Sequence, residues 1–304
     1  MKKILSLILL LLLLLTGMVA CDPSGAEQPP AEEGGSPAFD DGENYLFLHG
    51  NGGTSTLDPI PYETGAYVYI ESTDETVCRP GYIFGGWNDR PDGSGEIKIP
   101  HSGDFTPEST GLLPLYAQWH KEYAVGEAGP GGGTIFYDRI KASSEPFWGY
   151  IEWLYLEVSS LEMQDALPWG PDLGERYVGG TKAGIGAGKE NTELIIARLD
   201  DWKEHKYAAY WARFPLGADE DAQWFLPSRL ELGILHDYVR LNDSENNLGL
   251  HRLESDFYWS SQEGYEPTEH GNAFVHTFWL DKSGAQSNSH SKGTSHYVRP
   301  IRMF

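Results

Sequence analysis

The chain has 304 residues, of which 45 are Asp or Glu and 22 are Lys or Arg, for a formal net charge of −23. This balance argues against nucleic acid or a heparin-like polymer as partner, because binding such polyanions needs basic patches. Only two cysteines are present, which excludes a disulfide framework and a multi-cysteine zinc site.

The N-terminus has the layout of a secretory signal. Lys2 and Lys3 precede an almost purely aliphatic stretch over residues 4–15, which is shorter than the roughly 20 residues that a membrane-spanning helix needs. Small Ala20 directly before Cys21 resembles the lipobox of bacterial lipoproteins. The resemblance implies a signal peptide over residues 1–20 and a lipid on Cys21, which would hold the mature chain on a bacterial membrane at the surface of the cell envelope.

Residues 21–43 are rich in Pro, Gly and acidic side chains and have no apolar period. This composition predicts a disordered tether between the lipid and the folded part.

Residues 44–119 form the first predicted folded unit, with strands over 45–49, 66–70, 80–87 and 115–119. Several of its motifs, in their order and spacing, resemble the internalin-type B repeat (Listeria-Bacteroides repeat) of bacterial surface proteins: Asn51-Gly52-Gly53, Arg79-Pro80-Gly81-Tyr82, Gly86-Trp87-Asn88, Asp92 to Gly95, and Leu115 to Trp119. The resemblance implies a small β-grasp-like module. Cys78 is expected to be a small buried apolar residue.

Residues 120–304 form the second predicted unit. An apolar stripe from Asn191 to Phe214 predicts a helix. A second helix should begin at Ser228, because Glu231 follows three residues later in a capping-box pattern. Strands are expected over 134–137, 148–152, 257–261, 273–280 and 297–302.

The second unit also carries a family resemblance, to the Lcl C-terminal-like domain of collagen-like adhesins and exported lipoproteins. The motifs that support it are Gly129-Pro130, Gly186 to Thr192, Trp224 to Ser228, Tyr258 to Ser261, and Val298 to Arg302. The resemblance implies a C-type-lectin-like fold related to formylglycine-generating enzymes. The expected fold class is therefore α+β: a β-grasp-like repeat followed by a C-type-lectin-like α+β domain.

Catalysis has little support in the sequence. The related formylglycine-generating enzymes use a cysteine pair, and residues 120–304 contain no cysteine. A metal site remains an alternative, formed by the late histidines: His251, His270, His276, His290 and His296. No cofactor is expected, although oxygen-bearing residues keep calcium open: Asp256, Glu263, Asn272, Asp281 and Asn288.

The sequence favours a non-catalytic, surface-anchored adhesin-type module that binds an extracellular protein or glycan. Polar stretches over residues 262–272 and 282–296 lie between predicted strands and hold the candidate binding residues Tyr265, His270, Asn288 and His290. Two other functions stay open. One is an envelope enzyme or enzyme subunit with a metal on the late histidines, and the other is a purely structural envelope protein.

Overall fold

A computed structural model describes residues 43–143, 149–160, 166–171, 177–199, 206–215, 223–248, 256–264, 271–278 and 287–304. The chain forms two compact units. The first comprises the chain up to Glu122 together with Glu145–Glu152, and the second comprises Tyr123–Ser144 and Trp153–Phe304. The predicted signal, Cys21 and the tether lie outside the described residues.

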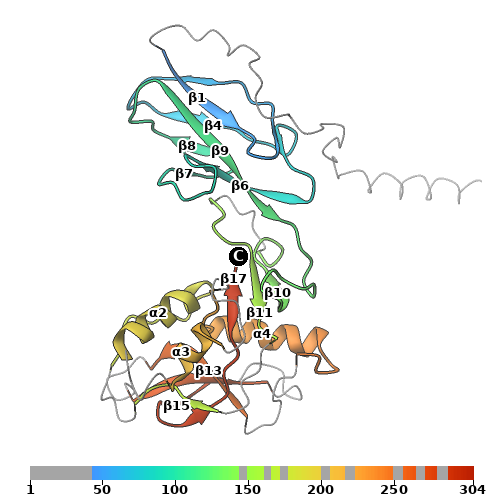
Figure 1. Ribbon diagram of the computed structural model, residues 1–304, viewed down its shortest axis with the longest axis vertical. Coiled ribbons are helices and arrows are strands. Elements are labelled where there is room, and N and C mark those ends of the chain that lie inside the picture. Colours follow the sequence, from blue (N-terminus) through green and yellow to red (C-terminus); the bar gives the residue numbers. More distant parts are fainter. Residues whose placement is uncertain are drawn as a thin grey trace, which may run out of the picture. The chain divides into compact units, whose positions relative to one another are not determined.

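The first unit is built on a five-stranded sheet in the order β3-β1-β9-β6-β7, with β1, β9 and β6 side by side (Figure 1). Its strands are β1 Asn44–His49, β3 Ile60–Tyr62, β6 Tyr82–Asn88, β7 Lys98–Ile99 and β9 Leu112–Lys121. Two short pairs complete the unit: β2 Thr54–Ser55 with β5 Val77–Cys78, and β4 Val68–Ile70 with β8 Gly103–Phe105.

Alternation along β1 explains how this sheet buries one face. Leu46 and Leu48 are buried, whereas Phe47 and His49 are exposed, as the two-residue period of a strand requires. Trp87 and Leu115 complete the core from β6 and β9. Cys78 is only half-buried on β5, and not fully buried as expected.

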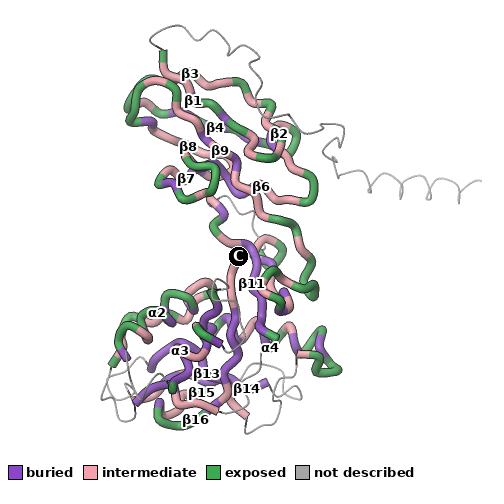
Figure 2. The backbone as a smooth tube through the Cα atoms, in the orientation of Figure 1, coloured by how far each residue is buried: buried purple, intermediate pink, exposed green. Residues whose placement is uncertain are grey.

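The second unit holds two three-stranded sheets. One joins β10 Thr134–Asp138, β11 Tyr155–Val158 and β17 Ile301–Met303, and the other joins β13 Phe257–Glu263, β14 Asn272–Thr277 and β15 Ser287–Ser291. A short pair links β12 Leu167–Pro168 to β16 Ser295–His296. Buried residues gather along β11, β13 and β14 (Figure 2).

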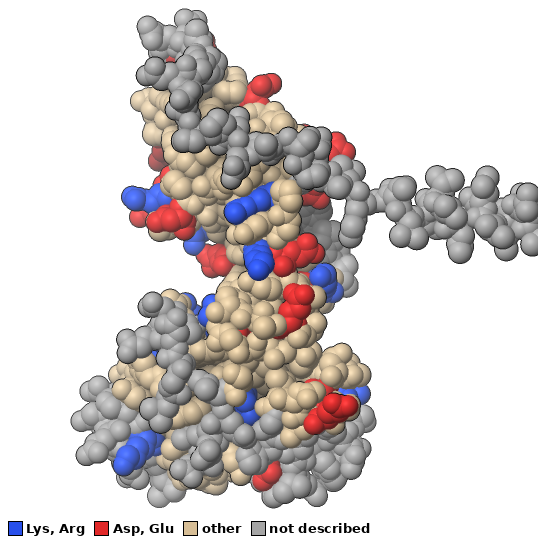
Figure 3. All heavy atoms as spheres, turned by 45° about the vertical axis from the view of Figure 1, so that its right-hand side comes forward, with Lys and Arg blue, Asp and Glu red and all other residues tan. Residues whose placement is uncertain are grey.

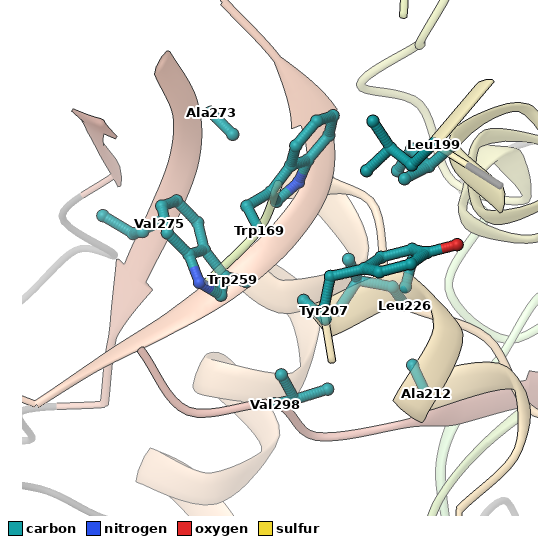
Figure 4. Packing of buried hydrophobic residues seen from close by; sticks show 12 residues of the cluster. Trp169, Leu199, Tyr207, Ala212, Leu226, Trp259, Ala273, Val275 and Val298 are labelled. Atoms are coloured by element: carbon teal, nitrogen blue, oxygen red, sulfur yellow. The ribbon is translucent and has the colours of Figure 1, made fainter. Parts of the chain in front are cut away.

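Three described helices belong to the second unit: α2 Ala187–Leu199, α3 Ala208–Arg213 and α4 Arg229–Asn242. Neighbouring residues of β13 project to opposite faces of its sheet. Trp259 joins the core formed with α2 and α3 (Figure 4), and Tyr258 joins the core formed with α4. The sheet is therefore covered on both faces, which fixes the position of its strands.

The expected α+β fold class, with a β-grasp-like and a C-type-lectin-like α+β domain, is wrong. Strands hold 35% of the described residues and helices only 16%, and the strands form several small sheets. The single helix predicted from Asn191 to Phe214 is interrupted: α2 spans Ala187–Leu199, Lys206 and Tyr207 are not helical, and α3 has six residues. Meanwhile short polar strands such as β15 carry no apolar period and were expected as loops.

Two other local predictions had different outcomes. The capping box at the start of α4 is confirmed, with Ser228 Oγ accepting from Glu231 N and the Glu231 carboxylate accepting from Ser228 N. The strand expected over residues 148–152 is wrong, since the described residues 149–152 belong to no strand. None of the helices in the described ranges combines the length and apolarity that crossing a membrane requires.

Charged side chains of the described residues are scattered over the face drawn in Figure 3. On the face drawn in Figure 3, Lys and Arg of the described residues lie among Asp and Glu and form no continuous basic area.

Candidate ligand-binding edge

The candidate site is the edge strand β15, with the sequence Ser-Asn-Ser-His-Ser. It pairs with β14 on one side, with Asn288 opposite Val275 and His290 opposite Ala273. Within the described residues, no strand pairs with its other side. Residues that lie opposite each other in an antiparallel pair share a face of the sheet. Asn288 and His290 therefore project on the same side as buried Val275 and Ala273.

Asn288 and His290 differ in how much of each side chain is exposed to a ligand. Asn288 is exposed, whereas His290 is half-buried. The His290 ring lies edge-on against Phe257, with ring centroids 4.5 Å apart. Its Nδ1 is 2.8 Å from Nε2 of His296. Asn288 is thus available to a ligand, and His290 belongs partly to the packing beneath it.

The two hydrogen-bonded histidines are neutral at pH 7. Burial lowers the pKa of His290 below its usual value. Burial, followed by the repulsion from His290 when that ring is protonated, lowers the pKa of His296 to about 4. In the neutral pair one imidazole donates and the other accepts. The edge therefore presents donors and acceptors without a charge.

The side chains that pack beneath β15, called its base below, are buried aromatic rings: His296, Trp259 and Trp169. His296 packs edge-on against Trp259, with ring centroids 4.7 Å apart. Trp259 donates from Nε1 to Leu167 O at 2.8 Å, and Trp169 donates from Nε1 to Ser260 O at 2.9 Å. Both indoles are fully buried and lie together in the core drawn in Figure 4. Strand β15 is held on this base through β14.

The structure places two of the four predicted binding residues, Asn288 and His290, two positions apart on β15. It puts them on a strand and not in the predicted loop. Tyr265 and His270 lie outside the described residues. The polar stretch over residues 262–272 also contains buried side chains at its start, since Gln262 and Glu263 are buried on β13.

The late histidines that the structure describes, His276, His290 and His296, do not form one cluster. His290 and His296 lie together, His276 is buried in the core formed with α4, and His251 and His270 lie outside the described residues. Across the described ranges, no three His, Cys, Asp or Glu side chains come close enough to hold a metal ion.

The five residues considered for calcium lie in different settings. Asn272 is on β14 and Asn288 on β15, and Asp281 lies outside the described residues. Asp256 comes directly before β13. Glu263 is buried, and its carboxylate accepts from the backbone N–H groups of Val178 and Gly179. Its oxygens are directed into the protein and not to a surface loop.

Sequence reasoning missed the buried partner of Glu263. Lys292 follows β15, is fully buried, and forms an ion pair with Glu263. Nothing in the sequence marks this lysine, because it stands in a polar stretch and its partner lies far away along the chain.

A polar hollow on the first unit is a second candidate site that the sequence did not reveal. Its volume is about 400 Å³, and its lining includes Lys98, Gln118, His120, Tyr150 and Glu152. Lys98 Nζ and the Glu152 carboxylate are 2.5 Å apart. His120 Nε2 is 2.8 Å from Ile151 O, so this nitrogen carries the proton and donates. Most of the polar groups in the hollow therefore already have partners within the first unit.

Comparison with known proteins gives limited likenesses. No family model matches the chain. A Gly-rich membrane protein of Evansella cellulosilytica is 33% identical over 96 residues, which cover 31% of this chain and 10% of that protein. The chain thus spans about a tenth of that relative's length.

Among solved structures, a fimbrial protein from Bacteroides ovatus aligns over 86% of this chain and 69% of its own, at 13% identity and a TM-score of 0.38. That score is too low to support an argument about fold or function. The two family resemblances seen in the sequence therefore stay proposals.

Proposed function

We propose that this chain is a non-catalytic lipoprotein of the bacterial cell envelope that displays a binding module of the adhesin type. A lipid on Cys21 holds it to the membrane, and residues 21–43 serve as tether. The first unit acts as a spacer of the internalin B repeat kind, and the second unit, of the Lcl C-terminal kind, carries the binding site. The likeness over 96 residues to a membrane protein of Evansella cellulosilytica is in keeping with an envelope location.

The observation that carries the proposal is the contrast between β15 and its base. Asn288 is exposed, whereas Ala273, Val275 and Trp259 beneath the same sheet face are fully buried. A rigid base lowers the conformational entropy that binding would cost. Polar side chains on such a base can change without disturbing the core, as in other binding proteins whose sites lie on a fixed scaffold.

The chemistry of the edge favours an uncharged polar partner. Ser, Asn and neutral His side chains supply donors and acceptors but no charge. The hydroxyl groups of a glycan or the polar surface of an extracellular protein match such a set. A strongly anionic partner would meet the acidic surface of a chain with net charge −23.

The test is a binding screen on arrays of glycans and extracellular proteins with the full chain in detergent micelles. Binding to whichever spot responds should fall at least about tenfold, or 1.4 kcal/mol, when Asn288→Ala is made, because an exposed polar contact is lost. Asn247→Ala, an exposed asparagine after α4, is the matched control and should leave binding unchanged.

A second variant strengthens the test. It replaces Tyr265, His270 and Asn288 together but keeps His290, because His290 packs against Phe257. Binding that survives in this variant, with the fold intact by circular dichroism, would place the site elsewhere. Failure of the wild-type chain to bind any spot would favour a purely structural envelope protein. Stoichiometric zinc or copper binding would favour the metal-dependent alternative.

A further inference from the structure

Glu263 and Lys292 form a lysine–carboxylate pair that is removed from water. Their side chains are 2% and 0% exposed, respectively. In the other lysine–carboxylate pairs of the described residues, the lysine side chain is 42% exposed for Lys98 and 63% exposed for Lys141 and Lys182. The reactive groups of Lys292 and Glu263 thus meet in the protein interior, where water does not compete.

Burial and the neighbouring groups act in opposite directions on the Lys292 amine. Its Nζ lies over the Trp169 ring, 4.8 Å from the ring centroid. Burial lowers the pKa of Lys292 below its usual value, although Glu263 opposes this. The backbone of Lys292 is fixed by three hydrogen bonds: its N–H donates to Gly271 O at 2.8 Å, and its carbonyl accepts from Trp169 N and Gly170 N at 2.9 and 3.2 Å. The Lys292 amine is therefore held against the carboxyl group of Glu263.

The carboxyl group of Glu263 is held just as firmly. Val178 N donates to Oε1 at 3.0 Å, and Gly179 N donates to Oε2 at 2.7 Å. The backbone N–H of Glu263 donates to Thr181 Oγ1 at 3.0 Å. Fixed N–H groups on a carboxyl oxygen stabilise the negative charge that develops there when a nucleophile attacks the carbon.

We propose that Lys292 and Glu263 condense within the folded protein to an isopeptide bond between Nζ and the side-chain carbonyl carbon Cδ. A proton first passes from the ammonium to Oε1, which gives a neutral amine and a neutral acid. Nζ then attacks Cδ, and the negative charge of the tetrahedral intermediate falls on Oε2 beside the Gly179 N–H. The Cδ–Oε1 bond breaks, Oε1 takes a second proton from Nζ, and one water molecule leaves.

Burial explains why condensation is favoured here and not at the surface pairs. An ion pair taken out of water bears a desolvation cost that its attraction repays only in part. The amide has no charge to desolvate, and its oxygen keeps the hydrogen bond from Gly179. The released water enters the solvent. The Lys182–Glu190 pair, with both side chains more than 60% exposed, lacks this driving force.

The cross-link would join the end of β13 to the turn after β15 and so close the segment that contains β14 and β15. This inference does not rest on the proposed function. A chain that binds nothing could still carry the bond, and a binding protein could lack it.

The experiment is mass spectrometry of the purified full chain. A tryptic digest should contain the peptide with Glu263 joined to the peptide with Lys292, at a mass one water below their sum, and trypsin should fail to cut after Lys292. Cleavage after Lys182 in the same digest is the internal control. Lys292→Arg keeps the charge but cannot form the bond, so its peptides should appear unlinked. Normal cleavage of the wild-type chain after Lys292, with both peptides at their sequence masses, would overturn the proposal.

Discussion

The buried imidazole of His276 makes the stability of the second unit depend on pH. Its side chain is 2% exposed, and neither ring nitrogen has a hydrogen-bond partner within the described part of the chain. Burial, helped by the nearby charges of His236 and Arg229, lowers the pKa of His276 to about 3. In the unfolded chain the pKa is about 6.5. Between these two values only the unfolded state binds the proton, so stability is lost as the pH falls.

His276→Phe should remove this dependence while preserving a ring beside Phe278. Between pH 7 and pH 5 the wild-type chain should lose about 2 kcal/mol more than the variant, measured by urea unfolding of the second unit. The wild type and the variant must be compared because a second group titrates in the same pH range: burial raises the pKa of Glu231 to about 7. That group adds stability as the pH falls from about 7 to 4.5, and so opposes His276 in both proteins.

Phe278→Leu controls for packing, since it changes the same core without removing a titrating group. Its cost should be the same at both pH values. Equal pH slopes for wild type and His276→Phe would mean that His276 is not the group responsible.

Helix α4 depends on its first turn. Ser228 is fully buried, and its Oγ accepts from Glu231 N at 3.3 Å while donating to Gly184 O at 2.8 Å. Ser228→Ala removes both bonds and leaves buried groups without a partner, so it should cost about 1–2 kcal/mol of unfolding free energy. Chemical denaturation of the full chain measures this. Ser295→Ala, at an exposed serine on β16, should stay within about 0.5 kcal/mol. A loss for Ser228→Ala no larger than that of the control would show that the cap contributes little.

How well each element could be predicted depended on whether its signal is local. The capping box and β1 were predictable because neighbouring residues alone determine them. Strand β15 was not, because its polar sequence becomes a strand only through pairing with β14. The break between α2 and α3 was not predictable either, since the apolar stripe gives no sign of the non-helical residues Lys206 and Tyr207. In the candidate site, residue type alone was enough to single out Asn288 and His290. The contact between Glu263 and Lys292 could not be predicted, because only the fold brings these two residues together.

At the scale of the whole molecule, the first unit is discontinuous along the chain. Glu145–Glu152 belongs to it, although residues 123–144 belong to the second unit. Ile151 is buried and donates from N–H to Gly85 O at 2.9 Å. A Cβ atom on Gly86 would lie only 2.9 Å from the ring of Tyr150 and would clash with it. The pair of glycines in β6 thus makes room for this segment.

A fragment of residues 43–122 should therefore fold but be less stable than the same unit in the full chain. The loss should be at least about 1.5–3 kcal/mol, the value of burying an isoleucine side chain. Urea unfolding of the fragment, compared with that of the full chain, measures it. Ile151→Ala in the full chain should weaken the first unit in the same direction and leave the transition of the second unchanged. A fragment as stable as the intact unit would show that residues 145–152 are not part of its fold.

The parallel pairing of β1 with β9 has a mechanical consequence. The register runs from Tyr45 opposite Leu112 to His49 opposite Tyr116. Because the strands are parallel, the chain enters at one end of this ladder and leaves at the other. Tension between the two ends of the unit therefore acts along the strands and loads the ladder's hydrogen bonds together, in shear, whereas a hairpin pulled at its open end would lose them one after another. The first unit therefore resists extension along its strands, which is the direction of pull that the proposed lipid-tethered spacer would experience.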